Sequence, residues 1–195
     1  MTIPEERQDE SQVEWFHRSG VLMVPDRLEM IANLLSLMPF QQDESFSVTD
    51  VGCGDAFLGE CLLTMFPNCE YQGLDGSPSM RHLAVERLSR FGSRADIKDF
   101  FVRYEEDQIH QISLEIVTTA RETDVVVATF FRVWPLDHLQ DLFLQLLSRV
   151  SSRGAMLFAD QVASEDHDRE KKGLAEWEAH VGRLGREDLV DIFNQ

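Results

Sequence analysis

Two glycines and one acid in this chain have a spacing that suits the binding of a nucleoside. Gly52 and Gly54 follow a segment with β-branched residues, 46–51, and precede an apolar-periodic segment, 58–66. This order predicts a strand, a tight glycine turn and a helix, whose first N–H groups stay free for a ligand that approaches the backbone closely. Asp75 comes about 20 residues after the loop, where a carboxylate can accept hydrogen bonds from both ribose hydroxyls.

The glycine loop alone fits more than one class of site. The G-x-G-x-x-G pattern of nicotinamide enzymes requires a third glycine where this chain has Phe57, and a large ring there would obstruct close packing of helix on strand. Asp50-Val-Gly-Cys-Gly-Asp55 instead resembles the first motif of class I S-adenosylmethionine-dependent methyltransferases, which needs no third glycine. The loop Asp75-Gly-Ser-Pro-Ser-Met80 resembles the loop after the second strand of that family. The resemblance implies S-adenosyl-L-methionine as the cofactor.

The resemblance also implies which residues contact the cofactor. Met80 is expected to pack near the adenine ring, and Arg18 to pair with the methionine carboxylate. For the end of the third strand, Tyr104 and Glu105 match the family pattern better than Asp99 does. A solvated acid in a loop is an equally good interpretation of Glu105. The implied cofactor-binding residues are Asp50, Gly52, Cys53, Gly54, Asp75, Gly76, Ser77, Met80, Tyr104, Glu105, Thr129, Phe130 and Arg18.

The segment after residue 128 resembles the fourth motif of the family, beside the transferable methyl group. Phe131 and Trp134, together with Trp15 near the N-terminus, are the implied substrate-binding residues. For each of these aromatic residues, a place in the hydrophobic core is an equally good interpretation. The catalytic residues stay unknown, because no histidine lies in a pattern that indicates a general base.

The pattern of elements predicts an α/β fold with strands at 46–51, 69–75, 97–102, 124–130 and 155–160. Helices are expected at 28–38, 58–66, 81–91 and 136–150, with a turn at 151–154. Strands that alternate with helices indicate a three-layer α/β/α sandwich with a mostly parallel sheet. This is the Rossmann-like fold that the resemblance implies.

We expect a single domain over residues 1–195. Residues 1–44 are expected to form N-terminal cap helices, 45–162 the cofactor-binding core, and 163–195 a helical cap or a shortened C-terminal part. The last two strands of the family are not visible in the sequence, so either the sheet is shortened or the sequence is a fragment. Apolar helix surface left uncovered would favour a homodimer or reduced stability.

Composition limits the partners. Lys and Arg number 18 against 35 Asp and Glu, a formal net charge of −17. This balance makes nucleic acid an unfavourable partner, because phosphate binding depends on basic side chains. No apolar run approaches the length of a membrane helix, and the acidic N-terminus is unlike a secretory signal, so we expect a cytoplasmic protein. The three cysteines do not form a metal-binding pattern, and no metal is expected.

These features predict methyl transfer from S-adenosyl-L-methionine to a small-molecule acceptor. The first alternative is a methyltransferase-like cofactor-binding or partner subunit without catalysis. The second alternative is a tRNA-modifying enzyme of the same fold, which the acidic composition disfavours.

Overall fold

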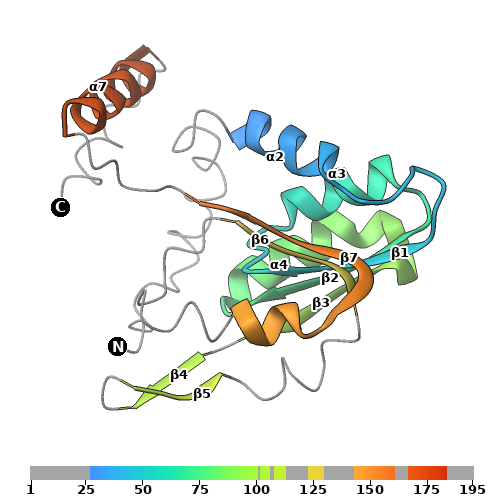
Figure 1. Ribbon diagram of the computed structural model, residues 1–195. Helices are drawn as coiled ribbons and strands as arrows, with labels where there is room; N and C mark the ends of the chain where they lie inside the picture. The colour runs from blue at the N-terminus through green and yellow to red at the C-terminus, as the bar shows by residue number, and fades with distance from the viewer. Residues whose placement is uncertain are drawn as a thin grey trace.

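A computed structural model describes residues 27–100, 102–105, 108–112, 123–129, 143–160 and 167–183. The chain begins its described course in helix α2 (Arg27–Ser36) and ends it in helix α7 (His167–Arg183), which lies apart from the sheet in Figure 1. Between them are the elements β1 (Phe46–Val51), α3 (Phe57–Met65), β2 (Cys69–Asp75), α4 (Pro78–Leu88), η2 (Ser89–Arg94), β3 (Ala95–Asp99), β4 (Val102–Glu105), β5 (Gln108–Ile112), β6 (Thr123–Thr129) and β7 (Val150–Ala159).

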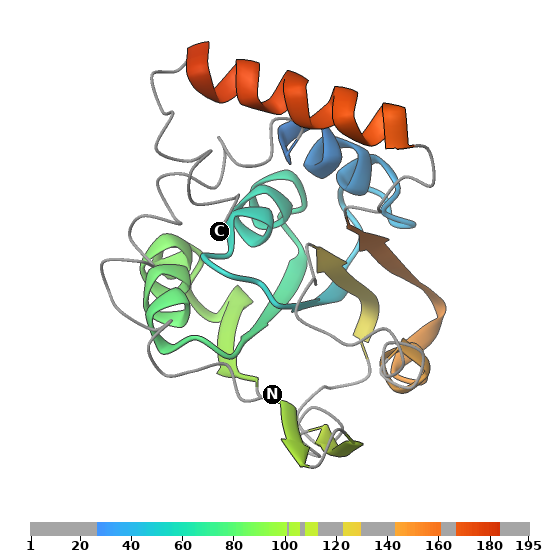
Figure 2. The same ribbon diagram turned by 90° about the vertical axis from the view of Figure 1, so that its left-hand side faces the viewer.

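Five parallel strands form the central sheet in the order β3-β2-β1-β6-β7. Figure 2 shows the twist of this sheet from a second direction. Val51, the last residue of β1, is in register with Leu74 of β2 and with Ala128 of β6. The carboxyl ends of these three strands therefore meet at one edge, which is where ligands bind in open parallel sheets.

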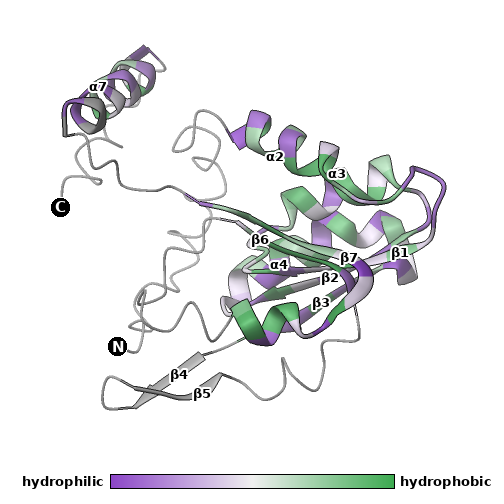
Figure 3. Ribbon diagram, viewed as in Figure 1, coloured by the Kyte–Doolittle hydropathy of each residue, from purple (hydrophilic) through white to green (hydrophobic). Residues whose placement is uncertain are grey.

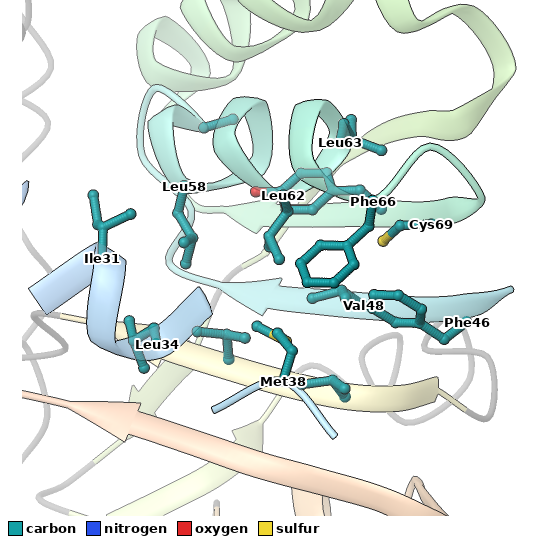
Figure 4. Close-up of a cluster of buried hydrophobic side chains, with 14 of the residues drawn as sticks. Ile31, Leu34, Met38, Phe46, Val48, Leu58, Leu62, Leu63, Phe66 and Cys69 are labelled. Carbon is teal, nitrogen blue, oxygen red and sulfur yellow. The ribbon is translucent and has the colours of Figure 1, made fainter. Parts of the chain in front are cut away.

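Helices cover both faces of the sheet, as the predicted three-layer α/β sandwich requires. On one face α2, α3 and α4 pack over a buried cluster that includes Ile31, Leu62 and Val48 (Figure 4). Figure 3 shows alternating hydrophobic and hydrophilic stretches along α2, which is typical of a helix with one buried side. On the other face the helical turn at 143–147 contributes Leu146 to a smaller cluster with Val126.

Strand β6 is deeply buried within the sheet. Its four central residues, 125–128, are each at most 1% exposed. A continuous apolar run is what a strand covered on both faces needs, and this run predicted the strand. The sequence prediction for β6 is therefore confirmed.

Two details of the predicted sheet are wrong. The third strand ends at Asp99, and Tyr104 and Glu105 belong instead to β4, which pairs antiparallel with β5 in a separate hairpin. Residues 151–154 are not a turn between elements but an irregular part of β7. Opposite them, the carboxylate of Asp124 accepts a hydrogen bond from Ser151 Oγ at 2.8 Å, which helps hold this stretch to β6.

Helix α3 approaches the sheet most closely at Gly59. A Cβ added at Gly59 would lie 2.5 Å from Cζ of the Tyr71 ring. The close contact expected of a third glycine in the loop is thus made two residues later, at Gly59. Phe57 does not obstruct it, because its ring packs against the guanidinium groups of Arg27 and Arg87, each 5.4 Å from the ring centroid.

The Gly59 contact leads to a stability prediction with a matched control. We expect Gly59→Ala to lower the free energy of unfolding by roughly 1–3 kcal/mol, because the methyl group overlaps the buried Tyr71 ring. Gly173→Ala in α7 meets no heavy atom within 4 Å. It should be neutral or stabilise by about 0.5–1 kcal/mol through helix propensity. Urea denaturation measures both, and equal effects of the two substitutions would contradict the close packing.

Candidate functional site

The loop between β1 and α3 is tied to the neighbouring strand. The N–H groups of Gly52 and Cys53 both donate to the carbonyl oxygen of Leu74, at 2.7 and 3.0 Å. Gly52 and Gly54 have φ values of 74° and 55°, in the left-handed region that glycine adopts without steric cost. A Cβ added at Gly54 would meet nothing within 4 Å, so the backbone conformation rather than crowding favours glycine there. The loop therefore leaves open space at Gly54.

Asp75 joins this glycine loop to the loop after β2. Its Oδ2 accepts a hydrogen bond from the N–H of Gly54 and its Oδ1 one from the N–H of Ser77, both at 2.8 Å. Burial raises the pKa of Asp75, and these two N–H groups oppose that rise. A carboxylate oxygen can accept more than one hydrogen bond. Asp75 therefore keeps capacity for two hydroxyl donors of a ligand.

The loop after β2 opens helix α4. Ser77 is the N-cap, and its Oγ accepts a hydrogen bond from the N–H of Met80 at 3.3 Å. Pro78 at the first helical position suits this start. The backbone at Gly76 lies so close to the carbonyl oxygen of Phe100 that only glycine fits. A Cβ added at Gly76 would lie 2.7 Å from that oxygen. Ser77 therefore caps the helix that follows the loop.

Asp99 closes β3 directly beside Asp75, with which it is in register. Arg81 bridges the two strand ends: its Nη1 donates to the carbonyl oxygen of Asp75 at 2.8 Å and pairs with Oδ1 of Asp99 at 2.7 Å. Asp99, Tyr104 and Glu105 were the candidates for the cofactor contact at the end of the third strand. Of these, Asp99 is the residue at the carboxyl edge of the sheet. Tyr104 and Glu105 lie in the separate hairpin. Only a clear strand boundary in the sequence could have distinguished them.

Asp50 lies beneath the glycine loop and is 1% exposed. Its Oδ2 accepts a hydrogen bond from the hydroxyl of Tyr71 at 2.7 Å. Its Oδ1 has no hydrogen-bond partner within the part of the chain that the structure describes. Burial raises the pKa of Asp50 to about 7, and the charge of Asp75 adds to this, while the Tyr71 hydroxyl opposes it.

Ionic contacts fix the other end of the glycine loop. The carboxylate of Asp55 pairs with Arg87 of α4 at 2.7 Å and with Arg27 of α2 at 3.6 Å. Glu60 of α3 pairs with the same Arg87 at 2.8 Å. Ala56, which follows Asp55, has φ 56°, an uncommon conformation for a residue with a side chain. Residue types alone gave no signal for this cluster, because its members are distant in sequence.

The structure places nine of the predicted cofactor residues in β1, β2, β6, the two loops and the start of α4. They are Asp50, Gly52, Cys53, Gly54, Asp75, Gly76, Ser77, Met80 and Thr129. Burial is the main cause that raises the pKa of the Cys53 thiol, and the charge of the nearby Asp50 raises this pKa further. The thiol therefore stays protonated, which disfavours it as a nucleophile. The predicted residues Arg18, Trp15, Phe130, Phe131 and Trp134 lie outside the described residues.

Tyr71 and Gly59 are site residues that the sequence analysis missed. Tyr71 is 2% exposed and shares one face of β2 with Asp75. Its period-two spacing from Asp75 was a usable signal, because alternate residues of a strand point to the same face.

Within the described ranges no helix combines the length and the apolar content that crossing a membrane requires.

No protein-family model matches the sequence. Among solved structures, the chain is similar to the mitomycin 7-O-methyltransferase MmcR, with a TM-score of 0.60 and 15% identity over 89% of this chain and 47% of that one. A Methanococcus maripaludis protein assigned to the S-adenosyl-L-methionine-dependent methyltransferases gives 0.59 and 16%, over 100% and 85%. A precorrin-6y C5,15-methyltransferase of Geobacter metallireducens gives 0.50 and 19%, over 78% and 71%.

These neighbours have TM-scores of 0.50 to 0.60 with this chain, which shows a similar fold. At identities of 15% to 19% they compare folds and not substrates. The chain therefore has the Rossmann-like fold of class I S-adenosyl-L-methionine-dependent methyltransferases.

Proposed function

We propose that this chain binds S-adenosyl-L-methionine and transfers its methyl group to a small-molecule acceptor. One observation carries the proposal. The Asp75 carboxylate, bonded to the N–H groups of Gly54 and Ser77, lies at the carboxyl edge of the sheet beside an open glycine loop. Methyltransferases of similar fold that act on small molecules support the reaction class.

The described residues suit the cofactor chemically. Asp75 would accept the ribose hydroxyls, and the backbone at Gly52 and Gly54 would allow close approach of the nucleoside. Met80, in the first turn of α4, would pack near the adenine. The buried Oδ1 of Asp50, without a hydrogen-bond partner in the described part, offers negative charge beneath the loop for a cationic ligand. A neutral ligand would leave that atom without compensation.

The protein's task in such a reaction is mainly orientation. The cofactor supplies, when bound, a methyl group already activated by its sulfonium. The chain then has to align the acceptor atom with that group and exclude water. We assign Arg18 to the methionine carboxylate and Phe130 to the cofactor, and Trp15, Phe131 and Trp134 to the acceptor pocket. A general base is needed only for an acceptor whose proton has a high pKa.

The reaction itself is tested by turnover. Incubation with S-adenosyl-L-methionine and a panel of small amines, phenols and carboxylic acids should release S-adenosylhomocysteine in the presence of a subset of them. Binding of the cofactor without turnover on any acceptor would favour the non-catalytic subunit. A shift of tRNA mobility at low salt would favour the tRNA-modifying alternative, which the net charge of −17 disfavours.

The ribose assignment is tested by Asp75→Ala. We expect S-adenosylhomocysteine to bind more weakly by on the order of 1–3 kcal/mol, or about 5-fold to 150-fold, because a charged hydrogen-bond acceptor is lost. Asp96→Ala on neighbouring β3 is the matched control. Asp96 is 53% exposed and pairs with Lys98, so its loss should leave affinity unchanged. Calorimetry on folded variants measures both, and equal affinity in the two variants would remove Asp75 from the site.

A further inference from the structure

The pair of Asp50 and Tyr71 is a costly polar arrangement among the described residues. Both side chains are buried, at 1% and 2% exposure, and a single hydrogen bond of 2.7 Å joins them. Asp50 Oδ1 has no hydrogen-bond partner within the described ranges. A buried carboxylate with one oxygen uncompensated is unfavourable, so the fold alone gives no reason to keep it.

The groups around Asp50 increase this cost. Tyr71 reaches it from β2, and the Cys53 thiol and the Asp75 carboxylate lie close enough to influence it electrostatically. None of the Lys, Arg and His residues that the structure describes forms an ion pair with Asp50. Among the described residues the surroundings of Asp50 are therefore acidic and neutral, and none of these residues balances the charge of an ionised Asp50 through an ion pair.

The Tyr71 ring cannot move away from Asp50 easily. An added Cβ at Gly59 would lie 2.5 Å from its Cζ, and one at Gly73 would lie 3.1 Å from its Cε1. The ring thus packs against the backbone of two glycines on different elements. The hydroxyl that it carries is held at a fixed place beneath the glycine loop, where it can orient one carboxyl oxygen and leave the other available.

We propose that Tyr71 is a positioning residue that holds the Asp50 carboxyl beneath the glycine loop, and that binding of a nucleoside that carries an ammonium group releases a proton from Asp50. This inference rests on the proposed function. In the free protein below about pH 7, Asp50 is largely protonated. The ammonium of the ligand then supplies the missing positive charge, the O–H bond of the carboxylic acid breaks, and the proton leaves to solvent. The Tyr71 hydroxyl continues to donate to the carboxylate.

The sign of the pH dependence follows from burial. Because burial raises the pKa of Asp50 to about 7, ionising it for the ligand costs free energy below that pH and none above it. Affinity should therefore rise with pH by up to about tenfold per unit below 7 and level off above. Loss of the Tyr71 hydroxyl, which opposes the raised pKa, should move the change to higher pH.

The experiment is titration calorimetry of S-adenosylhomocysteine between about pH 5 and pH 9 in buffers of different ionisation enthalpy. Wild type should release close to one proton per ligand near pH 6. Asp50→Asn should not release this proton. The pH dependence of its affinity reports the contribution of the nucleoside's own titration. Tyr71→Phe, which keeps the ring, should bind with its pH transition displaced upward. Tyr71→Phe with unchanged midpoint, or with uniformly weaker affinity at every pH, would make Tyr71 a packing residue and overturn the proposal.

A second readout avoids dependence on the folding of the tyrosine variant. The infrared difference spectrum of wild type on adding S-adenosylhomocysteine at pH about 6 should lose a protonated carboxylic acid band that Asp50→Asn lacks from the start. Ligand binding without that loss overturns the proton release and leaves the proposed function intact. Absence of binding by wild type at any pH overturns both.

Discussion

The hydrogen bonds that Asp75 accepts from Gly54 and Ser77 hold the two halves of the site together. Each links the carboxylate at the end of β2 to a different loop, at 2.8 Å. Without them the glycine loop would keep its two bonds to the Leu74 carbonyl and the ion pairs of Asp55, and the start of α4 would keep its serine cap, but no side chain would join the two loops directly at the strand end. The strand order brings these loops to one edge, and Asp75 sets the distance between them.

The rest of the fold fixes the position of this edge. Arg81 joins the ends of β2 and β3, and Asp55 joins α2 and α4 to the glycine loop through Arg27 and Arg87. Against this well-compensated set, Asp50 stands out as a buried acid with one oxygen unpartnered among the described residues. Proteins keep such unfavourable groups mainly where function requires them.

The sequence was most informative where a local rule decides the structure. The apolar run 125–128 predicted a strand buried on both faces, and the glycine loop with Asp75 predicted the edge that the structure displays. Local rules failed at the end of β3, where Asp99 and Glu105 are both candidate acids and only pairing with β2 selects Asp99. They also missed Tyr71, because its partner Asp50 is on another strand. Spacing can place Tyr71 on the same face of β2 as Asp75, but it cannot show the contact of Tyr71 with Asp50.

The most direct measurement is a crystal structure of the complex with S-adenosylhomocysteine. The account predicts that the nucleoside lies across Gly52 and Gly54, with both ribose hydroxyls within hydrogen-bond distance of the Asp75 carboxylate. A nucleoside bound elsewhere on the chain, or a glycine loop filled by the protein's own side chains, would contradict it.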